Sequence, residues 1–111
     1  DLRRTFPRFT DPHFSANLGL LEKARQHAFE LGCTIAQLAL AWTLARDEGV
    51  VPIPGTTNLK HLEDNFNAAS IVLPAELLAT LDDEFAPEAI SGPRYSEPAQ
   101  ATVTTERFSF E

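Results

Sequence analysis

Hydroxyl and amide side chains follow a glycine turn near the middle of the chain, where they could hold an anion. Gly55 is followed by Thr56, Thr57 and Asn58, directly before a segment with helical periodicity. The first amides of a helix lack internal partners and the helix dipole favours negative charge there, so this turn could bind a phosphate. Asn58 or Thr57 could equally satisfy those amides as an ordinary N-cap. The spacing alone leaves an anion site and a capped turn both open.

A short apolar run leads into this turn. Val50, Val51 and Ile53 are β-branched and are bounded by turn-forming residues, a pattern that predicts a very short buried strand at Val50–Ile53. A helix that passes at once into such a strand is typical of an alternating α/β protein. A single strand leaves backbone groups unpaired, so we expect the remainder of a larger protein, or another chain, to cover Val50–Ile53.

Helical periodicity surrounds the turn and predicts a mostly helical chain with that one short strand. The predicted helices lie near residues 17–31, 34–46, 58–69 and 74–85. The second of them opens with a Thr34–Gln37 capping box and is apolar on nearly all sides, so we expect it to be buried between neighbours. The apolar face of the third, which we also expect to be buried, consists of Leu59, Leu62, Phe66 and Ala69.

Composition and charge argue against several classes of function. The chain has 111 residues, enough for one small domain, and its formal net charge of −7 argues against nucleic-acid binding, which needs clustered Lys and Arg. No transmembrane run or signal-peptide pattern is visible, so no membrane partner is expected. The single cysteine, Cys33, excludes an internal disulfide and suits a reducing cytoplasm. The sequence opens on Asp1 and contains no methionine, so we expect it to have been cut from something longer.

No segment carries a complete catalytic or metal-binding motif. The sequence has no CxxC, HExxH, GxSxG or P-loop pattern, and its histidines fall in separate segments. We therefore predict neither catalytic residues nor metal ligands in this chain. His27 is expected to be solvated, Cys33 to be buried and inert, and the acidic run 82–84 to be a solvated helix face. A DNA-binding helix-turn-helix at residues 32–34 is disfavoured, because the helix that follows presents Ala, Leu and Trp.

The residues around the turn resemble those of one enzyme family. The run PIPGTT at residues 52–57, followed by LEDN at residues 62–65, resembles the coenzyme-binding segment of the aldo-keto reductases. The similarity extends to Arg3-Arg4, Pro7–Phe9, Gly32–Trp42 and Gly92–Tyr95, and so covers roughly residues 1–95. It implies an α/β fold in which residues 1–95 are the C-terminal portion of a (β/α)8 TIM barrel, with Val50–Ile53 as its last strand. Residues 96–111 are expected to be a mobile tail.

The resemblance also implies an activity for a longer parent protein. Aldo-keto reductases pass a hydride from NADPH to an aldehyde or ketone, whose oxygen is protonated by a Tyr supported by Lys, Asp and His. Those catalytic residues belong to the first part of the barrel and have no counterpart here, and Tyr95 is not the catalytic tyrosine. We therefore expect a coenzyme-binding part that is inactive alone. The alternative is a non-enzymatic helical protein-interaction module.

The resemblance assigns roles to individual residues by position. Gly55 and Thr56 occupy the turn that approaches the phosphate, and Thr56 and Asn58 would face the 2′-phosphate of the adenosine ribose. His61 lies where the family commonly has an Arg that pairs with this phosphate and covers the adenine. Asp64 and Asn65 would read the amino group and ring nitrogens of the adenine. The implied coenzyme-binding residues are Pro54, Gly55, Thr56, Asn58, His61, Asp64 and Asn65.

Two of these positions depart from the common family pattern. Asn58 stands where close relatives often have Lys, and His61 replaces Arg. Both changes remove fixed positive charge from a place where Arg would make bidentate phosphate contacts. We therefore expect NADPH to be the coenzyme, with a smaller margin over NADH than in an Arg-bearing relative and with NAD use possible.

Overall fold

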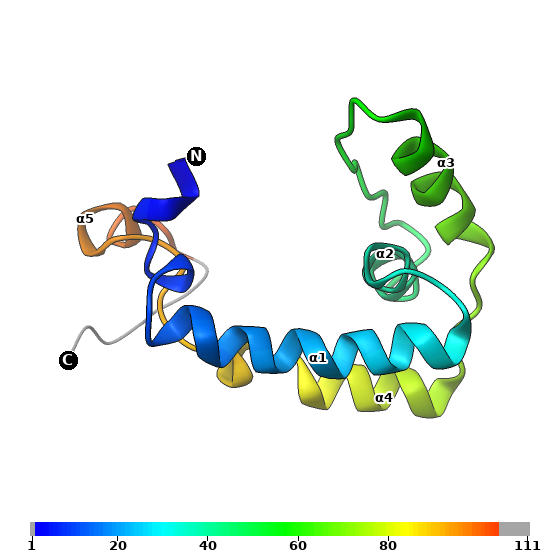
Figure 1. The fold of residues 1–111 in the computed structure, drawn as a ribbon, viewed down its shortest axis with the longest axis horizontal. Helices are drawn as coiled ribbons and strands as arrows, with labels where there is room; N and C mark the ends of the chain where they lie inside the picture. The colour runs from blue at the N-terminus through cyan, green and yellow to red at the C-terminus, as the bar shows by residue number, and fades with distance from the viewer. Residues whose placement is uncertain (1, 105–111) are drawn as a thin grey trace. The chain divides into compact units, whose positions relative to one another are not determined.

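The computed structural model describes residues 2–104, and its regular structure is helical (Figure 1). Two compact units are present: residues up to Leu21 together with those from Phe85 onward, and residues 22–84. In chain order, the 3-10 and α-helices are η1 (Leu2–Thr5), η2 (Pro7–Phe9), α1 (His13–Leu31), α2 (Ile35–Leu44), α3 (Leu59–Asn67), η3 (Ala68–Ser70), α4 (Ala75–Glu84), η4 (Pro87–Ala89) and α5 (Glu97–Gln100).

The predicted strand at Val50–Ile53 is wrong for the part of the chain that the structure describes. No residue from 2 to 104 is in a strand, and the segment between α2 and α3 is irregular. A β-strand exists through backbone hydrogen bonds to a neighbouring strand, and the described residues supply no such neighbour. Val51 and Ile53 are 80% and 92% exposed as a result, rather than buried.

The predicted helices are confirmed, with shifted ends. α1 begins at His13 rather than near residue 17, because the Asp11 carboxylate accepts hydrogen bonds from the Ser15 amide at 3.1 Å and from its hydroxyl at 2.5 Å. The same hydrogen bonds hold the pKa of Asp11 below its ordinary value. The third predicted helix divides into α3 and η3, because its last turn tightens to a 3-10 helix.

Residues 22–84 form the unit that carries the glycine turn. α2 packs against α3 and η3, and α4 runs back along α1 (Figure 1). The buried core combines small and branched apolar side chains from α1, α2, η3, the following link and α4, namely Ala24, Ala28, Leu38, Ala41, Ala68, Leu73 and Leu81. The small side chains let the helices approach closely.

The prediction that α2 and the apolar face of α3 are buried is wrong in part. Ala36 and Ala39 of α2 are exposed, although Leu38 and Ala41 are buried. On α3, Leu59, Leu62 and Phe66 are 71%, 54% and 80% exposed, and Ala69 after it is exposed as well. The face is apolar as predicted, but its three large side chains remain more than half exposed. We call Val51, Ile53, Leu59, Leu62 and Phe66 the exposed apolar stripe.

Polar contacts join α4 to α1 and α2. The His27 Nε2 nitrogen donates to Glu84 Oε2 at 2.9 Å, and Lys23 Nζ lies 3.5 Å from Glu84 Oε1. Asp82 accepts from Trp42 Nε1 at 2.7 Å and pairs with the Arg46 guanidinium, which also stacks over the Trp42 ring. The prediction of a solvated His27 is therefore wrong, since its side chain is only 18% exposed and bonds to another helix. The acidic face is solvated at Asp82 and Asp83, as predicted, but Glu84 is partly buried and Asp82 and Glu84 make contacts between helices.

The other unit is held by contacts between the first residues and those after α4. Arg8 Nε donates to the Gly92 carbonyl at 3.0 Å, and Phe6 meets Tyr95 edge-on at 5.7 Å. Asn17 and Ser91 exchange two hydrogen bonds, of 2.8 and 3.0 Å. Within the predicted tail, α5 is helical and Gln100 is only 5% exposed, whereas Phe108 and Phe110 lie outside the described residues.

Candidate functional site

The glycine turn opens onto a cavity of about 590 Å³ in the unit formed by residues 22–84. Six of the seven predicted coenzyme-binding residues line it, and only Asn58 lies outside the lining. Its walls come from the cap and first part of α2 as far as Leu40, from the turn, and from α3 between Lys60 and Asn65. The lining residues are Thr34, Ala36, Ala39, Leu40, Pro54, Gly55, Thr56, Lys60, His61, Asp64 and Asn65.

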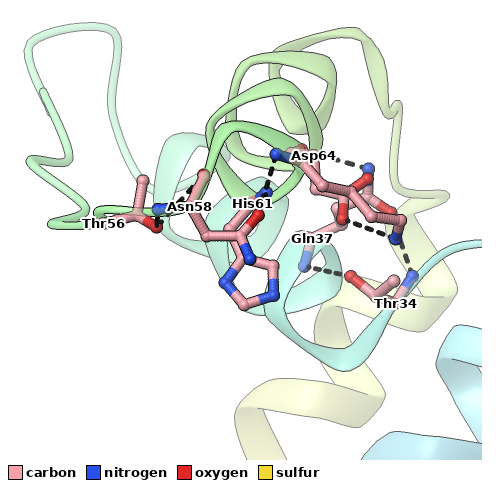
Figure 2. A network of polar contacts seen from close by, with 7 residues as sticks. Thr34, Gln37, Thr56, Asn58, His61 and Asp64 are labelled. Carbon is pink, nitrogen blue, oxygen red and sulfur yellow. Dashed lines mark hydrogen bonds and ion pairs between the residues drawn. The ribbon is translucent and has the colours of Figure 1, made fainter.

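Asn58 caps α3, so two of the first backbone amides of that helix already have a hydrogen-bond partner. Its Oδ1 oxygen accepts from the backbone amides of Lys60 at 2.9 Å and His61 at 3.3 Å. Its own amide donates to the Thr56 hydroxyl oxygen at 3.1 Å (Figure 2). The capped turn is therefore formed as the sequence allowed. Because two of the free amides of α3 are already occupied, an anion in the cavity would have to meet side chains or displace Asn58.

The start of α2 is fixed against α3 by a second set of hydrogen bonds. The predicted capping box is confirmed: the Thr34 amide donates to Gln37 Oε1 at 3.0 Å, and the Gln37 amide to Thr34 Oγ1 at 3.1 Å. Gln37 Nε2 also donates to the backbone carbonyl of Asp64 at 3.0 Å. Figure 2 shows the His61 ring projecting between Thr56 on one side and Thr34 on the other. One glutamine thus holds together the helices that form two walls of the cavity.

Lys60 is the lining residue with fixed positive charge that sequence reasoning missed. Its Nζ nitrogen lies 3.4 Å from Asp64 Oδ2, one helical turn further on. The Lys60 side chain is 78% exposed and that of Asp64 is 28% exposed. The spacing of four residues was visible in the sequence and could have indicated the pair. The lining residues from α2, by contrast, have no local signal, because their place depends on how α2 and α3 pack.

Cys33 directly precedes the lining residue Thr34 but is not itself among the lining residues. Cys33 is half-buried and unpaired by any disulfide, and burial raises the pKa of its thiol, which favours the unreactive protonated form. Across residues 2–104, no three His, Cys, Asp or Glu side chains gather closely enough to hold a metal ion. Over the same span, every helix is too short or too polar to cross a membrane.

Comparison with known proteins assigns the chain to a family. A sequence profile described as the Aldo/keto reductase family matches residues 2–84. The chain belongs to this family. An aldo-keto reductase of Schizosaccharomyces pombe, whose name specifies NADP(+), is 34% identical over 103 residues, which cover 93% of this chain and 30% of the relative. The chain therefore spans about 30% of the length of that relative. No solved structure gave a significant match.

The helical structure of this chain differs from the complete fold of its family. Aldo-keto reductases are TIM barrels, whereas the described residues of this chain are helical and include no strand. A complete barrel takes about 250 residues, so a chain of 111 residues corresponds to a fragment of one. The exposed apolar stripe is consistent with a piece whose barrel neighbours are not part of this chain.

Proposed function

We propose that this chain is the coenzyme-binding C-terminal part of an NADP(H)-dependent aldo-keto reductase that reduces aldehydes or ketones. Residues 1–95 would belong to the barrel and residues 96–111 to the tail that follows it. One observation carries the proposal: six residues implied by the family resemblance surround a single cavity at the start of α3. The relative named for NADP(+) supports the choice of coenzyme.

The cavity has the chemistry that the adenosine end of such a coenzyme needs. Its volume of about 590 Å³ falls within the usual range for small-molecule sites. The Thr56 hydroxyl, Lys60 and His61 would meet the phosphate, while Asp64 and Asn65 offer hydrogen-bonding groups for the adenine edge. Ala36, Ala39 and Leu40 supply a small apolar wall for the ring face. When bound in the parent enzyme, NADPH would supply the hydride.

The exposed apolar stripe supports the expected partner. Burying apolar surface is favourable by roughly 25 cal/mol per Å², and the stripe presents several large side chains at more than half exposure. We propose that the remainder of the barrel covers it, including Val51 and Ile53. The same stripe would serve the alternative function, a helical protein-interaction module. We also propose a cytoplasmic location, because a sequence with a single cysteine has no internal disulfide and suits a reducing compartment.

Binding of NADPH to the chain tests the proposal. We expect NMR titration with NADPH to shift the amide signals of residues 54–65 and to leave those of α5 in place. Asn65→Ala should weaken binding by about five- to tenfold, the worth of one lost hydrogen bond to the adenine. Asn67→Ala is the matched control, because Asn67 ends α3 outside the cavity and makes no cap hydrogen bond. Equal effects of the two substitutions, or shifts confined to other residues, would contradict the proposal.

A further inference from the structure

Lys60 occupies a position that helix stability does not explain. It lies in the first turn of α3, which contains no acidic residue. The helix dipole disfavours positive charge at this end. Its ion-pair partner, Asp64, follows four residues later, which is the less favourable order for such a pair on a helix. With 78% of its side chain exposed, Lys60 gains little from packing either.

The anchoring of Asp64 keeps the Lys60 ammonium beside the cavity. The backbone carbonyl of Asp64 is fixed by the side-chain amide of Gln37 at 3.0 Å, and 28% of the Asp64 side chain is exposed. The Nζ nitrogen of Lys60 is held 3.4 Å from this carboxylate, and both residues line the cavity beside Thr56 and His61. The distance is long for a charge-assisted hydrogen bond, so the flexible lysine can leave Asp64 for a better partner.

The other possible sources of positive charge in the cavity are limited. The amides of Lys60 and His61, which would otherwise attract an anion, already donate to Asn58. A histidine carries charge only when it is protonated. Among the described residues that line the cavity, Lys60 is the only lysine or arginine. An anionic group bound there at neutral pH therefore has one permanent cation to pair with.

We propose that Lys60 determines the preference for NADPH over NADH, by exchanging its Asp64 partner for the 2′-phosphate of the coenzyme. This inference rests on the proposed coenzyme-binding function. Asp64 has two opposed effects: it positions Lys60 at the cavity, and it competes with the phosphate for the same ammonium. The competition would keep the margin over NADH small, as the sequence predicts, although a cation is present. Lys60 thus supplies the fixed charge that His61, standing in place of Arg, does not.

The test compares two probes that differ by a single phosphate. Binding of adenosine 2′,5′-bisphosphate and of 5′-AMP to the 111-residue chain is measured by NMR titration, which reaches millimolar affinities, and the ratio of the two Kd values gives the selectivity. Lys60→Gln should weaken adenosine 2′,5′-bisphosphate about tenfold more than it weakens 5′-AMP, and so reduce this selectivity about tenfold. Lys60→Arg should retain it. Asp64→Asn should weaken both probes but raise the selectivity, because the competitor for Lys60 is lost.

A matched lysine controls for the change in overall charge. Lys23 is also exposed and ion-paired, to Glu84, but lies outside the cavity. Lys23→Gln removes the same charge from the chain and should leave the selectivity unchanged. Circular dichroism of each variant should show the helical content of the wild type.

The outcomes separate the inference from the function on which it rests. If neither probe shifts the amide signals of residues 54–65, the proposed coenzyme site is wrong and the proposed role of Lys60 is wrong as well. If both probes bind there, but selectivity survives Lys60→Gln and is lost in His61→Gln, the site is correct and the inference is overturned. Equal losses of selectivity in Lys60→Gln and Lys23→Gln would also overturn the inference, since they would show only a long-range effect of the net charge.

Discussion

At the scale of single residues, two glycines show how local geometry decides the effect of a side chain. Gly92 has a φ of +79°, and a Cβ there would lie 2.5 Å from the His13 ring, well inside van der Waals contact. Gly19 lies inside α1, and a Cβ there would meet nothing within 4 Å. A methyl group should therefore be costly at the first position and harmless at the second.

We predict opposite effects of the two Gly→Ala substitutions on thermal stability. Gly92→Ala should lower the free energy of unfolding by more than about 1 kcal/mol, through left-handed backbone strain and the clash with His13. Gly19→Ala should raise it by about 0.5–1 kcal/mol, because Ala is the better helix former. Thermal unfolding followed by circular dichroism measures both. A Gly92→Ala protein as stable as the wild type would show that this turn does not persist in solution.

Glu84 joins α4 to α1 by polar contacts with His27 and Lys23, and it makes stability depend on pH. The hydrogen bond from His27, with help from Lys23, lowers the pKa of Glu84 from its ordinary value of 4.5. A carboxyl whose pKa is lower in the folded state stabilises that state while it is ionised. The contribution is thus complete above pH 4.5 and is lost as the pH falls through the lowered folded-state pKa.

We predict that Glu84→Gln destabilises the chain by about 1 kcal/mol at pH 7 and has much less effect near pH 3. Urea unfolding at the two pH values gives both differences. Asp83→Asn is the control, since Asp83 is the exposed neighbour on the same helix. If the two substitutions had the same pH dependence, the contacts of Glu84 with His27 and Lys23 would not be formed in solution.

At the scale of elements, caps decide where the helices around the cavity begin. Thr34 caps α2 with its hydroxyl, and its own amide is satisfied by Gln37. Thr34→Ala should cost about 1 kcal/mol of unfolding free energy, while Thr80→Ala, inside α4, should cost less because that hydroxyl bonds only to the carbonyl one turn back. Urea unfolding compares the two variants. An equal cost would indicate that the capping box contributes nothing beyond an ordinary hydroxyl.

Local signals account for what could be predicted from the sequence at this scale. The helices, the Thr34–Gln37 box and the Asn58 cap follow from periodicity and capping within a few residues, and the structure contains them. The strand at Val50–Ile53 and the burial of Phe66 depend on partners elsewhere, which periodicity cannot reveal. The resemblance to the family's coenzyme-binding segment identified six of the residues that line the cavity. It missed Lys60 and the α2 wall, because these depend on a side-chain pair and on helix packing.

At the scale of the whole molecule, the described residues combine a cavity beside α3 with several large apolar side chains that are more than half exposed. Under the proposed function, the cavity binds one end of the coenzyme, and the acid and its supporting residues belong to a part of the barrel outside this chain. Binding energy from one end of a coenzyme does not replace groups that act at the reacting centre. The Tyr95 ring packs edge-on against Phe6, and Tyr95 is not among the residues that line the cavity.

We predict that these 111 residues bind NADPH weakly and reduce no carbonyl compound. Ordering the loop between α2 and α3 at the moment of binding costs free energy, so the affinity should lie well below that of a complete barrel. The measurement is NADPH absorbance with a panel of aldehydes, using protein of verified mass. Tyr95→Phe is the control, since it keeps the ring contact with Phe6 and removes the hydroxyl. Turnover that remains after full-length contaminants are removed, and that disappears in Tyr95→Phe, would reveal a catalytic site in this chain and overturn the proposal that catalysis lies elsewhere in the barrel.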